Sequence, residues 1–261
     1  MDKNDKNPFM TICFLYIGAV VTQRIGSYIT SLLSDNVVMH KLGENLTGLV
    51  YVLVVISLWK LWSRIEWFSM RGITRGYLFI LPAAYIAVNI GDLYPHTELN
   101  LYLGFSSRLA TGFLEELLCR GMVLALLIDY YQKKGETRYL LKSALISSVL
   151  FGIAHFANVI EHPDSVGAIT GQVVYATFIG VGFAAVYLQT RSLFPLILIH
   201  FAIDFVSFLT KSPGAADAKT FMDTLPAIVI CLPLLIYGMI LLNKKQQTKI
   251  ESSYMLESGT A

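Results

Sequence analysis

Long apolar stretches separated by short polar segments dominate the pattern of this chain. A helix needs about 20 mainly apolar residues to cross a bilayer. Apolar stretches of about this length occur eight times, at roughly residues 9–33, 45–62, 76–94, 108–131, 140–160, 167–189, 192–210 and 221–243. The pattern therefore predicts an all-α, polytopic membrane protein with about eight transmembrane helices.

The composition agrees with this prediction. The chain has 261 residues, of which 55% are hydrophobic and 15% are charged, and such a chain is too apolar for an ordinary soluble domain. We expect one transmembrane domain over residues 1–243, with a motif-bearing core at 108–210, and a polar, disordered cytoplasmic tail at 244–261. No small-residue cleavage site follows the first apolar stretch, so we expect it to remain as a membrane helix. The net charge of +2 gives no reason to expect a nucleic-acid partner.

The distribution of basic residues predicts the orientation. Lysine and arginine are concentrated in alternate connections, namely residues 60–75, 133–142, 191 and 244–249. Basic loops face the cytoplasm in most membrane proteins. Eight spans with this alternation place both termini in the cytoplasm.

The cysteines do not suggest a metal site or a disulfide framework. Cys13, Cys119 and Cys231 lie far apart and within apolar stretches. We expect all three to be small core residues.

Charged residues interrupt the fourth apolar stretch. Glu115, Glu116 and Arg120 lie in a run that is otherwise apolar, where a charge costs roughly 2.5–3.5 kcal/mol or more. Glu116 and Arg120 are spaced i, i+4 and can pair on one helix face. Glu115 points about 100° away, so it is free for chemistry. The alternative is a salt bridge with a purely structural role. The preceding segment, residues 97–107, is expected either to lie in the membrane interface or to re-enter the membrane.

Polar residues recur in the later stretches. His155 lies in the fifth, and His200 and Asp204 share a helix face in the seventh. At about 1.5 Å per residue, these side chains and Glu115 fall in one layer near the outer surface, which predicts one shared polar site. Gln172 falls near the same level and Arg24 deeper, and both are expected to make structural hydrogen bonds or to support the site.

Such a site permits two kinds of chemistry. A carboxylate in an apolar pocket can act as a general base on water, while imidazoles can hold that water or bind a metal. These are the groups needed to hydrolyse a peptide bond within the membrane. They also suit a proton relay in a transporter.

The order of these motifs resembles a known family. Glu115-Glu116-x-x-x-Arg120, Phe151-x-x-x-His155 and His200-x-x-x-Asp204, on three separate helices, resemble the CAAX protease and bacteriocin-processing (CPBP, abortive-infection) family of intramembrane endopeptidases. The resemblance implies a fold of eight helices around a polar intramembrane cavity.

The resemblance also implies roles for these residues. Glu115 would activate water with support from Glu116 and Arg120, His155 would help to hold the water, and His200 would line the site. Asp204 stands where the family often has an asparagine that stabilises the oxyanion. An ionised aspartate cannot donate a hydrogen bond, so Asp204 is expected either to be protonated or to orient His200.

The family's mechanism is described both with and without zinc. We favour a metal-free site. If a metal is present, His155, His200 and Glu115 are its expected ligands.

We therefore expect an intramembrane endopeptidase in a bacterial cell membrane. Its expected partners are the bilayer and a membrane-associated peptide or protein substrate. The predicted orientation puts the polar layer near the outer face, which favours a peptide precursor or leader over a prenylated cytoplasmic protein. The alternatives are a non-catalytic bacteriocin-immunity or partner-binding protein with the same fold and, less favoured, a transporter. The oligomeric state and the route of substrate access do not follow from the sequence.

Overall fold

The structure is a computed structural model that describes residues 7–211 and 218–257. All secondary structure in this described part is helical, which confirms the predicted all-α class. The longer helices are α1 (Pro8–Ser31), α2 (Val37–Leu58), α4 (Ile80–Val88), α5 (Glu98–Glu116), α6 (Leu124–Lys133), α7 (Tyr139–Ala154), α8 (Val166–Thr190), α9 (Phe194–Thr210), α10 (Leu225–Leu241) and α11 (Lys244–Glu257). The short elements are η1 (Trp62–Arg64), α3 (Met70–Thr74), η2 (Gly76–Phe79), η3 (Leu117–Val123), η4 (His155–Ile160), η5 (Pro163–Ser165) and η6 (Met222–Thr224).

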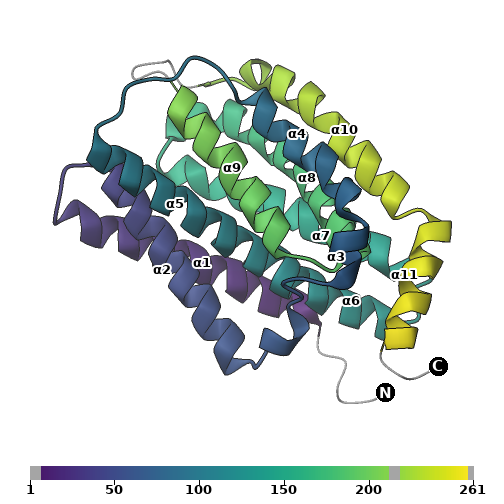
Figure 1. The fold of residues 1–261 in the computed structure, drawn as a ribbon. Coiled ribbons are helices and arrows are strands. Elements are labelled where there is room, and N and C mark those ends of the chain that lie inside the picture. The colour runs from purple at the N-terminus through teal and green to yellow at the C-terminus, as the bar shows by residue number, and fades with distance from the viewer. Residues whose placement is uncertain (1–6, 212–217, 258–261) are drawn as a thin grey trace.

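The long helices form one bundle. α1 packs along α2, α2 along α5 and α5 along α9, while α8 lies between α7 and α10 (Figure 1). α5, η3 and α6 follow one another without an intervening loop. This composite helix, Glu98–Lys133, starts ten residues earlier than predicted, and residues 98–107 form its first turns. The expected position of this segment, in the interface or re-entering the membrane, stays a prediction.

The number of spans is confirmed only in part. Within the described residues, five helices are long and apolar enough to cross a membrane: Pro8–Ser31, Val37–Leu58, Tyr139–Ile160, Pro163–Thr190 and Met222–Leu241. Two other predicted spans appear as the shorter apolar helices Gly76–Val88 and Phe194–Thr210. The remaining predicted span, 108–131, lies within the composite helix, which carries the charged motif.

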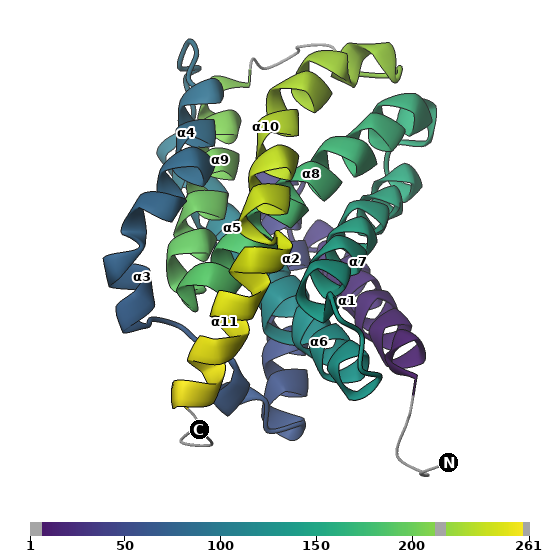
Figure 2. The same cartoon turned by 90° about the vertical axis from the view of Figure 1, so that its right-hand side faces the viewer.

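The connections gather at two opposite ends of the bundle (Figures 1 and 2). At one end, which we call the basic end, the start of α1 lies with η1, α3, the α6–α7 connection and α11. Ion pairs join its loops: Arg64 pairs with Asp129, and Arg191 with Glu66. At the other end, Asn36 donates to Asn100, and Thr210 donates to the Asn89 carbonyl. The basic connections thus share one end, as their alternation along the sequence predicted.

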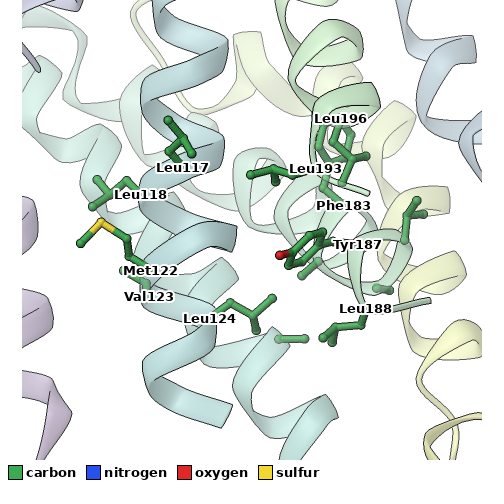
Figure 3. Packing of buried hydrophobic residues seen from close by; sticks show 14 of the residues in the cluster. Leu117, Leu118, Met122, Val123, Leu124, Phe183, Tyr187, Leu188, Leu193 and Leu196 are labelled. Atoms are coloured by element: carbon green, nitrogen blue, oxygen red, sulfur yellow. The ribbon is translucent and has the colours of Figure 1, made fainter. Parts of the chain in front are cut away.

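The densest packing lies toward the basic end. Residues of η3 and the start of α6 face the second half of α8 and the start of α9 (Figure 3). The core side chains shown there include Leu117, Leu124, Phe183, Leu193 and Leu196, each at most 1% exposed. This cluster lies between the charged motif and the basic end of the bundle.

Two expectations about peripheral residues were wrong. The tail is helical over Lys244–Glu257 rather than disordered, because Gln247 hydrogen-bonds the Leu141 and Leu242 backbone and Ile250 is buried. Residues 258–261 of the predicted tail lie outside the described residues. Cys13 is exposed rather than a core residue, whereas Cys119 and Cys231 are buried, and all three thiols are free.

Candidate active site

Glu116 is the buried anchor of the polar cluster. Its side chain is fully buried, and its Oε1 accepts hydrogen bonds from Arg120 Nη1 at 2.8 Å and from His200 Nδ1 at 2.8 Å. Carboxylate acceptors do not donate, so His200 carries a proton on Nδ1. The i, i+4 pair predicted from the sequence is therefore present, and it also fixes the orientation of an imidazole from α9.

Arg120 is held on several sides. Its guanidinium lies 5.1 Å from the centre of the Phe151 ring and 5.5 Å from that of Phe183, and Nη2 donates to the Gly180 carbonyl at 3.4 Å. A cation between two aromatic faces gains favourable electrostatic contact. The charge that Glu116 needs is thus fixed by packing from α7 and α8.

The helix widens directly after the two glutamates. η3 is π-helical over Leu117–Val123, and each of its residues is buried. Wider turns of this kind occur often at functional sites, where they redirect side chains. Here the widened segment begins one residue after Glu116 and contains Arg120.

Glu115 faces the opposite way from its buried neighbour. Its side chain is 28% exposed, and its Oε2 lies 3.5 Å from His200 Nε2. The carboxylate lines an internal cavity and has no arginine or lysine within 4.0 Å in the described part of the chain. Of the two glutamates, Glu115 is therefore the one that a substrate or water can reach.

His155 contributes a defined acceptor. It is the first residue of η4, and its Nδ1 lies 3.0 Å from the Phe151 carbonyl oxygen. A carbonyl only accepts, so Nδ1 carries the proton and Nε2 of the neutral ring is free to accept. A ring in this state can receive a hydrogen bond from water in the cavity.

Asp204 lies close to His200 without orienting it. Its Oδ2 is 3.9 Å from His200 Nε2, which is longer than a hydrogen bond. Glu116, at 2.8 Å, orients the imidazole instead. Asp204 therefore makes no direct hydrogen bond to His200, and its expected role stays a prediction.

The six predicted site residues line one cavity of about 600 Å³. This volume lies within the usual range for small-ligand pockets. The structure brings Glu115, Glu116, Arg120, His155, His200 and Asp204 to it from α5, η3, η4 and α9. Their catalytic roles stay predictions.

A group of charged residues, which we call the rim, lies toward the end of the bundle opposite the basic end: Arg24, Lys41 and Glu44 line the cavity, and Glu161 pairs with Arg24 and Lys41. Arg24 pairs with Glu161, and Lys41 lies 2.8 Å from both Glu161 and Glu44. Partial burial alone would raise the pKa of Glu161, but the hydrogen bond and charge of Lys41, followed by those of Arg24, bring this pKa below its ordinary value. The rim ties α1 and α2 to the connection between η4 and η5.

Sequence reasoning misplaced one rim residue and missed others. Arg24 was expected to lie deeper than the site, but it reaches Glu161 in the connection between two helices. Gln172 makes the expected hydrogen bond, as the acceptor for Asn158 at 3.2 Å. Lys41 and Glu44 lie outside the motifs and near the start of α2, so only the fold brings them to the cavity.

The predicted metal ligands are not arranged around a common point. In the described residues, no three histidine, cysteine, aspartate or glutamate side chains are grouped as a metal site requires. The Nδ1 atoms of His155 and His200 are engaged with Phe151 and Glu116. These bonds leave Nε2 of each ring open to a ligand, so the metal-free site stays a prediction.

One comparison with known proteins finds a family match over part of the chain. No curated protein and no solved structure matches the chain. Residues 97–206 match the family described as type II CAAX prenyl endopeptidase Rce1-like. The match extends from the residue before α5 into α9 and contains all three motifs. Residues 97–206 are therefore similar to the Rce1-like family of CAAX endopeptidases, which confirms the resemblance seen in the motifs.

Proposed function

We propose that this protein is an intramembrane endopeptidase in which Glu115 activates water. The observation that carries the proposal is the division of labour between the adjacent glutamates. Glu116 is engaged by Arg120 and His200, while Glu115 faces the cavity and has no arginine or lysine partner among the described residues. Such a carboxylate is suited to take a proton from water.

The surrounding groups support this chemistry. One water proton would go to Glu115, and the other would hydrogen-bond the free Nε2 of His155. The water oxygen would then attack the scissile carbonyl carbon, and collapse of the tetrahedral intermediate would break the C–N bond while Glu115 passes its proton to the leaving amine nitrogen. His200, with Nδ1 fixed by Glu116, presents Nε2 to the same space, and a proton on that atom would stabilise the developing oxyanion. A protonated Asp204 could donate a second hydrogen bond.

The substrate that we propose is a membrane-associated peptide or protein. The cavity lies within an apolar bundle, and a segment that is already held at the membrane is therefore the substrate that we infer. We retain a bacterial cell membrane and cytoplasmic termini as the proposed setting. Lipid-anchored peptides with and without a prenylated cysteine will determine which anchor is accepted.

The first test is cleavage by the purified protein in detergent. Quenched fluorescent peptides carrying either anchor are compared with wild type and Glu115→Gln, each with and without a chelator. We expect Glu115→Gln to lower the rate about 10²–10⁴-fold, the usual contribution of a general base, and chelator to have no effect.

The other outcomes point elsewhere. Loss of cleavage on chelation would indicate a metal enzyme, and equal rates for the two proteins would remove Glu115 from the mechanism. A folded protein that binds but never cleaves these peptides would favour the partner-binding alternative. Proton-coupled uptake without cleavage would favour a transporter.

A further inference from the structure

The segment that carries His155 contains no buried residue. η4 continues α7 as a 3₁₀ helix, and each of its residues keeps part of its surface exposed. Phe156 and Ile160, its largest apolar side chains, are 41% and 67% exposed. A 3₁₀ helix has poorer hydrogen-bond geometry than an α-helix, and a segment with few buried contacts opens easily. The position of His155 therefore depends on the polar contacts that η4 makes with its neighbours.

Arg24 of α1 makes one of these contacts. Its Nη2 donates to the carbonyl of Ala157, in the second half of η4, at 3.3 Å. Basic side chains near the C-terminal end of a helix can bind its last carbonyls, and their charge interacts favourably with the helix dipole. Arg24 thus caps the helix that carries His155, although it lies 133 positions before Ala157 in the chain.

Gln172 of α8 makes the other contact, by accepting a hydrogen bond from the Asn158 side chain at 3.2 Å. Consecutive residues of η4 are therefore held by two different helices, α1 and α8. The His155 ring is fixed differently, since its Nδ1 bonds the Phe151 carbonyl of its own helix at 3.0 Å. This internal bond moves with the helix and does not determine where the helix end lies.

Arg24 is itself fixed by two carboxylates. Its guanidinium pairs with Glu161, which follows η4, and lies 3.8 Å from Glu44 of α2, whose side chain is 8% exposed. Lys41 pairs with the same two carboxylates, but it donates to no carbonyl of η4 in the described part of the chain. The two cations thus share their ionic partners and differ in the contact with η4.

We propose that Arg24 is a positioning residue for His155 and that it acts through the Ala157 carbonyl. The inference rests on the proposed function, because it takes His155 to hold the attacking water. By fixing the end of η4, Arg24 would keep the free Nε2 of His155 directed toward the water at Glu115. α1 lies outside residues 97–206, so a helix that the family match does not cover would complete the geometry of the site.

A double-mutant cycle tests this coupling. The kcat and KM for a lipid-anchored quenched peptide are measured in detergent for wild type, Arg24→Gln, His155→Ala and the double variant. We expect Arg24→Gln to lower kcat about tenfold to a hundredfold, as for a misplaced catalytic group, and to leave KM unchanged. In the His155→Ala background the same substitution should not lower kcat further, because residues that act through one another are not additive.

Two further variants separate positioning from charge. Lys41→Gln is the matched control, because it removes a positive charge from the same two carboxylates and should leave kcat unchanged. Arg24→Lys keeps the charge and a donor and should restore part of the lost kcat. It also preserves the test if Arg24→Gln does not fold, which melting curves in the same detergent will show.

Hydrogen exchange at residues 155–162 gives a readout that does not depend on cleavage. The backbone amides of Glu161 and His162 donate to the Asn158 carbonyl, so release of η4 should speed up their exchange in Arg24→Gln but not in Lys41→Gln. Unchanged exchange in Arg24→Gln would overturn the proposal. An equal loss of kcat with and without His155 would also overturn it, as would a rise in KM alone, which would indicate a role in access.

Failure of the proposed function has a different signature. It would appear as equal cleavage by wild type and Glu115→Gln, or as no cleavage by either. The exchange rates would then still decide whether Arg24 holds η4 in place.

Discussion

The two halves of α8 face different surroundings, although both are apolar. From Gly180 to Thr190 every residue is buried, and this half packs against the core of η3, α6 and α9. From Val166 to Ile179 few residues are buried, and Gln172, Tyr175 and Ile179 line the cavity. Hydropathy does not predict this division, because the division depends on which helices pack against each half. One half of α8 thus packs in the hydrophobic core, while the other half lines the cavity that holds the polar cluster.

The charged motif lies at the border between these halves. Arg120 donates a hydrogen bond to the carbonyl of Gly180, the first residue of the packed half, while Glu115 lines the cavity. This contrast predicts opposite responses of adjacent glutamates. Removing the buried partner should unfold the protein, whereas removing the cavity carboxylate should mainly stop the chemistry.

The largest predicted effect on stability follows from Glu116→Ala. It leaves Arg120, 3% exposed, without its carboxylate, and breaking a buried pair costs about 3–5 kcal/mol. Glu115→Ala is the matched control and should change the free energy of unfolding by less than about 1 kcal/mol. Denaturation in detergent, followed by circular dichroism, measures both. Equal destabilisation by the two variants would show that the border does not separate a structural from a reactive carboxylate.

A smaller effect is expected from shortening one apolar side chain in each half of α8. Leu188 is 2% exposed in the packed half, whereas Ile179 lines the cavity. Leu188→Ala should lower stability by about 2–5 kcal/mol, because its neighbours cannot close the new void. Ile179→Ala enlarges an existing space and should cost less than half as much. Melting temperatures in the same detergent give the comparison, which fails if the cavity-side variant is equally destabilised.

The site was more predictable than the cavity around it. The pairing of Glu116 with Arg120 followed from i, i+4 spacing, and the shared polar layer followed from helix rise. The role of Glu116 in orienting His200 did not, because that contact joins α5 to α9 and depends on their packing. The family match, which starts at residue 97, likewise omits Arg24 and Lys41, which reach the cavity from α1 and α2.

The fold shows the same limit. Hydropathy found the long apolar helices, but it did not recognise residues 98–107 as the start of the motif helix, since this segment mixes polar and apolar residues and most of its polar side chains are exposed. Ser107 accepts a hydrogen bond from Asn45 of α2 at 2.9 Å. This contact joins residues 62 positions apart, so local polarity along the sequence does not reveal it.

The smallest predicted effect concerns the rim, where ion pairs rather than apolar packing join α1 and α2 to the connection that follows η4. Because the pKa of Glu161 is lowered in the folded protein, the stability from its pairs is fully present above the ordinary glutamate pKa of about 4.3 and is lost as pH falls through the lowered value. Glu161→Gln should cost about 1 kcal/mol or less at neutral pH and nothing once wild-type Glu161 is protonated. Melting curves from pH 7 down to pH 3 test this, with Glu136→Gln as the control, since Glu136 pairs with Lys142 at the basic end.

If both variants respond alike to added salt but only Glu161→Gln changes the cleavage rate, the rim controls access to the cavity. If neither changes the rate, the rim only braces α1 and α2, and the functional difference between the two ends lies in the cavity itself.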